Sequence, residues 1–344
     1  MKYDYVIYLC RFQPFHDGHY ETLVQALAQG ERVILGIGSA NRSRSTDNPF
    51  TYEERCDMID ASLTEIESNR VEFMPISDFP YNDTAWTLHV TNTVNQHFKD
   101  MDLPFDKVAL IGFKKDDTSR YLDFFPNWDY IGVDEMHGIM SATDVRDAYF
   151  RKGPIISQFV PKGVSDFLKQ FVLTRDYKWL LHEFEYIREY PTLWGKGPFI
   201  TVDAVVEQMG HILLVTRRDA PFKGKLAIPG GFVNLNEWID KARLRELKEE
   251  TKLADAYGEI PPGKLQLLLK KEKVYDDPRR SARGRVITFA GLYRLPNAKQ
   301  LYTVIGSDDA EKAAWYNLSE LDASMFMEDH YFIIQDMLGV TEGV

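Results

Sequence analysis

Hydrophobic residues in the first part of the chain form short unbroken runs separated by a stretch with helical spacing. Residues 5–12 (YVIYLCRF) and 33–38 (VILGIG) are runs typical of strands buried on both faces, and residues 18–29 carry apolar positions three and four apart. A strand, a helix and a strand within about thirty residues form a βαβ unit, which requires a parallel sheet. Two further strands of this sheet are expected at 108–112 and 130–133.

The pattern changes near residue 190. The first part is expected to end with three helices, at residues 144–151, 164–173 and 178–188. Residues 190–198 (YPTLWGKGP) then contain two prolines and two glycines, a composition typical of a linker. The elements predicted after it are strands at 200–206 and 212–216, a Pro-Gly-Gly turn at 229–231, one strong helix and more strands. We therefore predict two α/β domains, over residues 1–188 and 189–344.

Composition and charge narrow the class of protein. The 344 residues are enough for two domains, and 44% hydrophobic and 27% charged residues are ordinary globular values. The 52 acidic residues outnumber the 41 basic ones and give a net charge of −11, which argues against a general nucleic-acid-binding protein. The chain has no run of about eighteen apolar residues, no signal-peptide pattern and only two cysteines, so we expect a cytoplasmic protein without a membrane span.

Two histidines, His16 and His19, follow the first expected strand at the start of the expected helix. Because they are three residues apart, both imidazole rings can face one point, which also receives free N–H groups and the positive end of the helix dipole. Such a point suits a polyphosphate better than a metal ion alone. Ordinary surface or core histidines are the alternative, and Arg11, Pro14 and Gly18 around them after a buried strand argue against it.

These residues resemble the signature G-R-F-x-P-x-H-x-G-H of the HxGH nucleotidyltransferase superfamily. The chain matches every specified position except the first, where Cys10, also a small residue, replaces glycine. Residues 141–146 (SATDVR) stand at a helix start, with Ser141 or Thr143 as N-cap, and look like the second phosphate-binding motif of the superfamily. Alone they would indicate a capped helix with a solvated arginine. Downstream of the histidine loop they indicate that a hydroxyl and Arg146 hold ATP phosphates.

Two further segments indicate which nucleotidyltransferase the chain resembles. Residues 48–55 (NPFTYEER) and 81–86 (YNDTAW) are similar to those of archaeal-type nicotinamide mononucleotide (NMN) adenylyltransferases, and the likeness extends in patches over residues 3–175. The resemblance places Trp86 against the nicotinamide, since an aromatic face attracts a flat cation, and a core tryptophan is the alternative. Adenylyltransferases for pantetheine phosphate or flavin mononucleotide share the histidine loop and are the alternative activity.

The resemblance implies a Rossmann-like domain that transfers AMP from ATP to NMN. The NMN phosphate attacks ATP directly and in line, giving NAD and pyrophosphate in the presence of Mg²⁺. The catalytic residues that the resemblance implies are Arg11, His16 and His19. The nucleotide-binding residues that it implies are Phe12, Gln13, Gly18, Asn48, Arg55, Trp86, Ser141, Thr143 and Arg146.

Acidic residues gather in the strong helix expected in the second part of the chain. Glu246 lies one helical turn before both Glu249 and Glu250, so the three carboxylates project from one side. Carboxylates this close repel one another, and hard divalent cations such as Mg²⁺ or Mn²⁺ best explain them. Arg245 is placed to orient a carboxylate, with Glu237 as the candidate. A solvated amphipathic helix is the alternative, because several lysines lie nearby.

The spacing from Gly231 to Leu253, G-x5-E-x7-R-E-U-x-E-E with U aliphatic, resembles the Nudix box. Lys252 departs from it, replacing a glycine that eases a left-handed helix end, and we expect it to strain or redirect that end. The resemblance implies an α/β/α domain with a mixed sheet that hydrolyses a nucleoside diphosphate linked to another group. The metal ligands that it implies are Glu246, Glu249 and Glu250. The candidates for the general base are Glu246, Glu250 and Glu328.

A basic loop at 275–285 (YDDPRRSARGR) is similar to the loop of ADP-ribose pyrophosphatases in which arginines meet the phosphates and the terminal ribose. The resemblance implies hydrolysis of ADP-ribose to AMP and ribose 5-phosphate, with Arg279, Arg283 and Arg285 as binding residues. A solvated charge run is the alternative for the loop. A different diphosphate substrate and a non-catalytic ligand-sensing module are the alternatives for the domain. The sequence leaves assembly into a homo-oligomer open.

Overall fold

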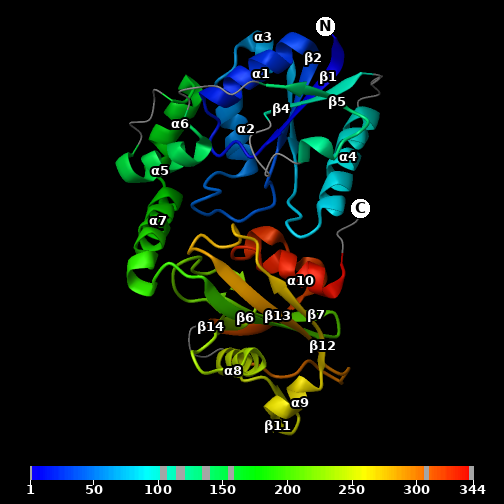
Figure 1. Cartoon of the computed structure of the whole chain (residues 1–344), viewed down its shortest axis with the longest axis vertical. Coiled ribbons are helices and arrows are strands. Elements are labelled where there is room, and N and C mark those ends of the chain that lie inside the picture. The colour runs from blue at the N-terminus through cyan, green and yellow to red at the C-terminus, as the bar shows by residue number, and fades with distance from the viewer. Residues whose placement is uncertain are drawn as a thin grey trace. The chain divides into compact units, whose positions relative to one another are not determined.

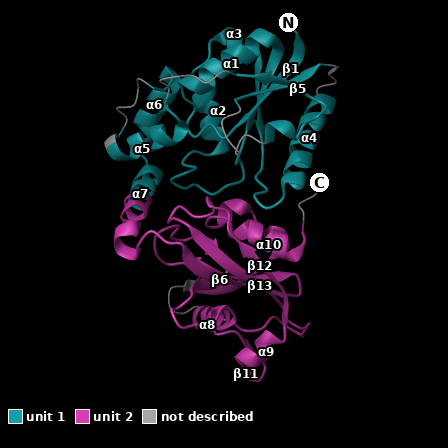
Figure 2. Ribbon diagram, viewed as in Figure 1, with its two compact units in different colours: residues 1–182, 343–344 teal, residues 183–342 magenta. Residues whose placement is uncertain are grey.

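The computed structural model of the protein describes residues 2–100, 107–113, 121–133, 140–153, 159–305 and 310–340. The chain divides between His182 and Glu183 into two compact units, here unit 1 and unit 2 (Figure 2). The sequence pattern predicts this division six residues later, followed by a linker. Helix α7 (Arg175–Trp194) instead runs through the division and past Pro191. Pro191 cannot donate to the carbonyl four residues earlier, but its own carbonyl accepts the N–H of Gly195 at 3.0 Å, so the helix completes one more turn after it.

Unit 1 is built on a five-stranded parallel sheet, which confirms the predicted fold class (Figure 1). The strand order is β3-β2-β1-β4-β5, with strands at Tyr3–Cys10 (β1), Gly30–Ile37 (β2), Val71–Pro75 (β3), Val108–Gly112 (β4) and Asp129–Gly132 (β5). The helices are α1 (Asp17–Gln29), α2 (Tyr52–Asp60), α3 (Glu65–Ser68), α4 (Asp83–Asp100), α5 (Ala142–Lys152), α6 (Lys162–Phe171) and the first part of α7. The strand order reverses beside β1, so β1 ends at the crevice where open parallel sheets bind ligands.

Helix α4 is 18 residues long, yet the sequence pattern does not predict it. Its buried side chains are few, namely Ala85, Val90, Val94 and Phe98. The last three form one hydrophobic core with Tyr5, Ile7 and Ile34 of the sheet. This apolar stripe is narrower than the usual buried face of an amphipathic helix, so hydrophobic periodicity in the sequence does not reveal the helix. The helix is held by burial, at about 1.5–3 kcal/mol for each large apolar side chain.

Unit 2 contains a mixed sheet with strand order β12-β13-β6-β7-β14, in which β13 and β6 are parallel. The strands are β6 (Phe199–Gln208), β7 (His211–Arg217), β8 (Leu226–Ala227), β9 (Gly230–Phe232), β12 (Leu269–Tyr275), β13 (Val286–Arg294) and β14 (Ala310–Asn317), with β10 (Ala254–Asp255) and β11 (Gly258–Glu259) as a separate pair. The helices are α8 (Ile239–Thr251), α9 (Pro262–Gln266) and α10 (His330–Leu338). Helices α8 and α10 lie on opposite sides of the sheet, as predicted (Figure 1). Among the helices of the described residues, none has the length and apolar content of a membrane span.

The Pro-Gly-Gly segment, predicted to be a turn, instead leads into strand β9. This strand pairs with β6 and passes close to both β6 and α8. A Cβ atom on Gly230 would lie 2.2 Å from the carbonyl oxygen of Val202, and one on Gly231 would lie 2.5 Å from Oε1 of Glu246. The two glycines are therefore required by close approach to neighbouring atoms rather than by turn geometry.

Gly163, in the first turn of α6, lets α6 contact the end of α2. A Cβ atom on Gly163 would lie 2.5 Å from the backbone C and O atoms of Ala61. We expect Gly163→Ala to lower the free energy of unfolding by about 1–3 kcal/mol, because backbone atoms cannot rotate away as a side chain can. Gly263→Ala in α9 is the control, since an added Cβ there meets no atom within 4 Å. Urea unfolding measures both variants, and equal stabilities would contradict the contact.

Candidate active sites

The two histidines of unit 1 lie side by side at the start of α1. His16 is the N-cap, and its Nδ1 accepts the N–H of Gly18 at 3.2 Å, while its own N–H donates to Nδ1 of His19 at 3.3 Å. The two rings stack with centroids 3.7 Å apart. Because each Nδ1 accepts a hydrogen bond, each neutral ring carries its proton on Nε2. Burial lowers the pKa of His16 to about 2 and that of His19 to about 3, so both rings are neutral N–H donors at pH 7.

Cys10, which stands at the glycine position of the superfamily signature, contacts this pair. Its Sγ lies 3.3 Å from Nε2 of His19 and accepts the ring proton that this nitrogen carries. The carbonyl of Cys10 accepts the N–H of Gly38 at 2.9 Å, which joins the ends of β1 and β2. Burial raises the pKa of the Cys10 thiol, so it is neutral at pH 7. The sequence indicates only that Cys10 is small, whereas the structure makes it a partner of His19.

Gln13 positions the loop between β2 and α2. Its side chain is buried, and Nε2 donates to Oδ1 of Asn48 at 2.5 Å and to the carbonyl of Phe50 at 2.8 Å. Its Oε1 accepts the N–H of Phe50 at 3.0 Å. Gln13 and Asn48, both predicted to bind nucleotide, therefore bond to each other. Phe12, predicted with them, is also buried and packs its ring edge-on against His19, with centroids 5.0 Å apart.

Arg55 lies inside unit 1 and joins three segments of backbone. Its Nε donates to the carbonyl of Thr51 at 3.0 Å, and its Nη1 donates to the carbonyls of Arg11 and Gly38, each at 2.6 Å. The side chain is 1% exposed, and burial lowers its pKa to about 10, so it stays charged at neutral pH. The structure thus makes Arg55 an internal support of the loop after β1, in place of the substrate contact predicted for it.

The SATDVR segment starts α5 and reaches the histidine loop. Ser141 is the N-cap, and its hydroxyl accepts the N–H three residues ahead at 3.2 Å. The buried guanidinium of Arg146 donates to the carbonyl of Gln13 at 2.7 Å and to Oγ1 of Thr143 at 3.2 Å, and it lies 3.7 Å from Asp47. The structure therefore brings Arg146 to the loop that carries the histidines, from 133 residues further along the chain.

Arg11 and Trp86 differ in their surroundings. Arg11 is exposed, and its side chain makes no hydrogen bond or ion pair with any residue that the structure describes. Trp86 is half-buried on α4, with its ring edge-on to Tyr121 at 5.8 Å and to Phe125 at 5.9 Å between centroids. The hydroxyl of Tyr121 donates to the carbonyl of Leu9 at 3.2 Å, which places this aromatic group beside the end of β1. Trp86 is thus partly core, as the alternative reading expects, and partly open to a ligand.

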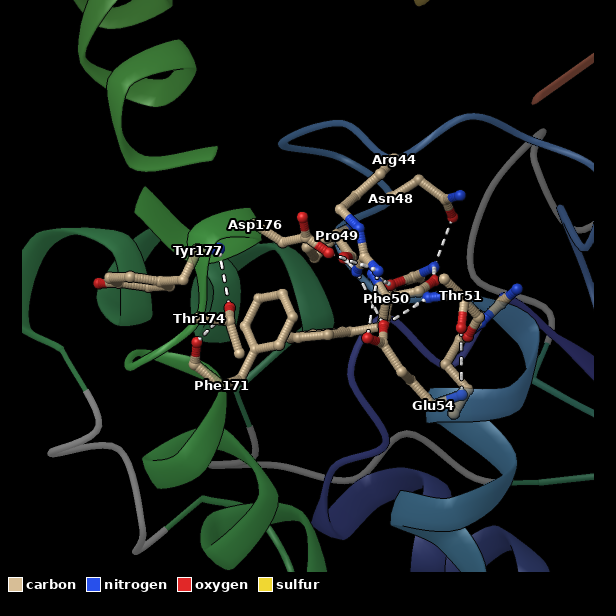
Figure 3. Close-up of polar contacts among 12 residues, drawn as sticks. Arg44, Asn48, Pro49, Phe50, Thr51, Glu54, Phe171, Thr174, Asp176 and Tyr177 are labelled. Carbon is tan, nitrogen blue, oxygen red and sulfur yellow. Dashed lines mark hydrogen bonds and ion pairs between the residues drawn. The ribbon is translucent and has the colours of Figure 1, made fainter. Parts of the chain in front are cut away.

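Arg44, which sequence reasoning missed, anchors the loop between β2 and α2 (Figure 3). Its guanidinium donates to both carboxylate oxygens of Glu54, at 2.8 and 3.1 Å, and to the carbonyl of Pro49. It also lies 3.2 Å from the carboxylate of Asp176 at the start of α7, and 5.4 Å from the ring centroid of Phe171. These partners come from three separate segments, and no local pattern in the sequence signals them.

Arg245 organises the site of unit 2. It pairs with Glu237 across the loop, as predicted, through Nε at 2.7 Å and Nη2 at 2.9 Å. Its Nη1 donates to Glu246 at 2.8 Å and to Glu249 at 3.0 Å. Hydrogen bonds from Arg245 hold the pKa of Glu237 at about 2, so this carboxylate is ionised at neutral pH.

Glu250 lies apart from Arg245 and is buried. Its carboxylate accepts the N–H of Gly230 at 2.9 Å. Burial, and to a smaller extent the charge of Glu246, raise the pKa of Glu250 to about 8 against the opposing effect of the Gly230 N–H. The charged form of Glu250 is therefore poorly compensated within the protein, and a bound cation would compensate it.

The donor set fits a divalent cation, although the carboxylates are not gathered around one point. In the part of the chain that the structure describes, no three His, Cys, Asp or Glu side chains are arranged to hold an ion. Glu246 and Glu249 both accept from Nη1 of Arg245, whereas Glu250 accepts from the N–H of Gly230. Binding of one cation by all three carboxylates stays a prediction. The carboxylate oxygens are the hard donors that Mg²⁺ or Mn²⁺ prefers, and a bound cation would compensate the charged form of Glu250.

Lys252 ends α8 without redirecting it. It adopts the left-handed conformation itself, with φ 44° and ψ 43°, and its N–H donates to the carbonyl of Lys248 at 3.0 Å. A non-glycine residue in this conformation costs about 1–2 kcal/mol. The expected strain is therefore local, and the helix ends as it would with glycine.

Two buried ion pairs hold the basic loop at 275–285. Arg280, which the sequence does not single out, donates to Asp329 through Nε and Nη2, each at 2.9 Å. Arg283 pairs with Glu328 at 3.1 Å, and the hydroxyl of Ser281 donates to Glu328 at 2.6 Å. Burial raises the pKa of Glu328, but the charge of Arg283 and the Ser281 hydroxyl outweigh it and hold this pKa below its usual value. Glu328 is thus an ionised partner of Arg283 rather than a free base.

The other two predicted arginines bond within the loop itself. Arg279 is exposed and lies 3.6 Å from the carboxylate of Asp277, and Arg285 donates to the carbonyl of Asp276. Exposed pairs such as that of Arg279 are worth about 0–1 kcal/mol, so a ligand could displace them at little cost. Substrate binding by Arg279 and Arg285 stays a prediction.

Comparison with known proteins matches each unit to a family. The cytidylyltransferase-like family model matches residues 7–147, and the NUDIX domain model matches residues 197–337. A nicotinamide/nicotinic acid mononucleotide adenylyltransferase from Acinetobacter baylyi is 39% identical over 183 residues, which are 53% of this chain and 94% of that protein. An ADP-ribose pyrophosphatase from Methanocaldococcus jannaschii is 37% identical over 141 residues, which are 41% of this chain and 73% of that protein.

A solved structure resembles the chain along its whole length. It is a bifunctional NMN adenylyltransferase/ADP ribose pyrophosphatase from Francisella tularensis, complexed with AMP and a manganese ion. The two chains are 34% identical with a TM-score of 0.87, and the match covers 99% of this chain and 100% of the other.

The contacts of Arg55 predict a large effect from a conservative change. We expect Arg55→Lys to lower the free energy of unfolding by about 2–4 kcal/mol, because an ammonium group cannot reach the three carbonyls that the guanidinium joins. Arg151→Lys on α5 is the control, since Arg151 is an exposed partner of Asp147. Urea unfolding compares the two, and an Arg55→Lys protein as stable as the control would contradict the supporting role.

The raised pKa of Glu250 predicts how a divalent cation stabilises the protein at different pH. Without metal, the stability that protonated Glu250 contributes is complete below about pH 4.5 and is lost as pH rises through about 8. Mg²⁺ binds the ionised form, so we expect it to raise Tm more at pH 8.5 than at pH 6. Thermal unfolding with Mg²⁺ or with EDTA measures this. Glu250→Gln should abolish the difference, and an equal rise at both pH values would refute the assignment.

Proposed function

The chain belongs to the family of proteins that join a cytidylyltransferase-like domain to a NUDIX domain, and from this premise we propose two activities for it. Unit 1 transfers AMP from ATP to NMN, giving NAD and pyrophosphate, and unit 2 hydrolyses ADP-ribose to AMP and ribose 5-phosphate. The observation that carries the proposal is that one chain contains both sites. One is the stacked pair of neutral histidines at the start of α1, and the other is the set of carboxylates around Arg245 on α8.

In the transferase reaction, a phosphate oxygen of NMN attacks the α-phosphorus of ATP. The new P–O bond forms as the bond to the β-phosphate breaks, and pyrophosphate leaves without a covalent enzyme intermediate. The groups proposed to neutralise the developing charge are Nε2–H of His16 and His19, the N–H groups that start α1, and the guanidinium groups of Arg11 and Arg146. Backbone hydrogen bonds hold both rings, so the donors need little reorganisation.

In the hydrolase reaction, water adds to one phosphorus of the diphosphate and the bridging P–O bond breaks. We assign Glu246, Glu249 and Glu250 to a divalent cation, with Mg²⁺ ahead of Mn²⁺, which polarises phosphate oxygens and lowers the pKa of bound water when present. In the structure, Arg245 donates hydrogen bonds to two of these carboxylates, those of Glu246 and Glu249. The ion pair of Glu328 with Arg283 leaves Glu246 and Glu250 as the candidates to accept the proton.

The alternative functions receive less support. A ligand-sensing module would not need the carboxylate set, and unit 2 retains Glu237, Glu246, Glu249 and Glu250. Transfer of AMP to pantetheine phosphate or flavin mononucleotide is less favoured, because the relatives that match unit 1 are named for NMN or nicotinamide nucleotide.

Two single variants test the proposal by separating the activities. We expect His19→Ala to lower NAD synthesis at least about 100-fold and leave ADP-ribose hydrolysis unchanged, because it removes one donor to the phosphates. Glu250→Gln should lower ADP-ribose hydrolysis and leave NAD synthesis unchanged. Chromatography of the products from ATP with NMN, and from ADP-ribose with Mg²⁺, measures both. Wild-type protein that produces neither NAD nor AMP would reject the proposal, and either variant losing both activities would point to misfolding.

A further inference from the structure

Arg243 of α8 is buried between this helix and the sheet of unit 2. The side chain is 1% exposed, and its Nε donates to the hydroxyl of Tyr293 at 2.8 Å. Its Nη1 donates to the carbonyl of Phe289 at 3.4 Å, and its Nη2 donates to the carboxylate of Glu272. The guanidinium therefore joins α8 to β13 and to β12, the strand beside it.

Gly291 leaves the space that this guanidinium occupies. It lies on β13 opposite Glu272 in the strand register and two residues before Tyr293, so the three share one face of the sheet. A Cβ atom on Gly291 would lie 2.6 Å from Nε and 2.7 Å from Cζ of Arg243. Gly291 lacks a positive φ, so space rather than backbone conformation requires a glycine there. Gly291, Tyr293 and Glu272 are here named the arginine slot.

A charged side chain at this position needs a reason other than stability. Leu244 and Leu247 of α8 lie in the hydrophobic core of unit 2, and an apolar residue beside them would avoid the cost of burying a guanidinium. An arginine adds direction, because its hydrogen bonds fix the rotation of α8 and its position along β13. Position 243 is one of the seven that the Nudix spacing leaves unspecified between Glu237 and Arg245, so the motif does not account for it.

Two of the candidate cation ligands lie further along α8. Glu250 is seven residues after Arg243, so it lies on the same side of the helix, two turns or about 10 Å away. It accepts the N–H of Gly230, and a Cβ atom on Gly231 would lie 2.5 Å from Oε1 of Glu246. Both carboxylates therefore lie against β9 with little room. A rotation of α8 would move them away from β9 or into it.

We propose that Arg243 is a positioning residue of the hydrolase site. It fixes α8 in the arginine slot, so that Glu246 and Glu250 meet a divalent cation beside β9. The assignment rests on the function proposed for unit 2. Arg243 acts through the backbone of α8, because its own donors are taken up by Tyr293, Phe289 and Glu272.

Substitutions of Arg243 should change the requirement for Mg²⁺. We expect Arg243→Met, which keeps a long side chain without donors, to raise the Mg²⁺ concentration for half-maximal ADP-ribose hydrolysis at least about 10-fold. Arg243→Lys, which keeps the charge without the planar set of donors, should raise it less. Ile212→Val, the control, removes one buried methyl group from β7 and should leave the value within about twofold. NAD synthesis by the same preparations should be unchanged, which reports on the folding of each variant.

The arginine slot can also be tested with Arg243 in place. Gly291→Ala should raise the same Mg²⁺ concentration, because the new Cβ takes the space of the guanidinium. In Arg243→Ala protein it should have no further effect, since the other atom it meets, Cδ1 of Leu269 at 3.0 Å, ends a flexible side chain. Effects of the two changes that simply add would contradict the slot.

A second readout needs no turnover. Mg²⁺ should raise the Tm of the wild-type and Ile212→Val proteins at lower concentrations than that of Arg243→Met. If wild-type protein hydrolyses ADP-ribose and both Arg243→Met and Gly291→Ala keep its response to Mg²⁺ in both measurements, the inference is overturned. If Arg243→Met does not fold, unchanged responses in Arg243→Lys and Gly291→Ala overturn it. Wild-type protein that hydrolyses no nucleoside diphosphate derivative, while its Tm response to Mg²⁺ still depends on Arg243, would reject the hydrolase function and retain the positioning role.

Discussion

The two sites depend on arginine side chains that join segments lying beyond the ends of the strands. A guanidinium group is planar and has five donors, so one arginine can satisfy several carbonyls or carboxylates at once. In unit 1, Arg55 does this for the loops that leave β1 and β2 and for the start of α2. In unit 2, Arg245 does it for the carboxylates of Glu237, Glu246 and Glu249. The loops keep their positions because these charged donors are shared between segments.

Many of the polar side chains of unit 1 therefore hold the loops that carry the histidines. Gln13 and Asn48 bond to each other, and the hydroxyl of Ser141 caps α5. The groups proposed to meet a ligand are the Nε2–H donors of the two histidines, of which that of His19 also contacts Cys10, together with Arg11, Arg146 and the N–H groups that start α1. A site arranged in this way before the substrate arrives needs little reorganisation during the reaction.

The sequence predicts what depends on local spacing. The parallel sheet follows from apolar runs, and the pairing of Arg245 with Glu237 follows from their places around one loop and helix. It does not predict contacts between distant segments, such as those that link Arg280 to Asp329 across 49 residues. It also misses α4, whose buried stripe is narrow. Burial decides which arginine is internal, and no local pattern separates Arg283, which is paired, from Arg279, which is exposed.

The left-handed Lys252 bears on how such chains are recognised. Glycine at that position meets a conformational preference of the backbone, whereas the glutamates of α8 supply chemistry, and the helix ends in the same way with lysine. The two kinds of position should therefore diverge at different rates during evolution, since a modest loss of stability can be compensated elsewhere and a lost ligand cannot. A search pattern that demands glycine there would overlook a chain whose carboxylates are all in place.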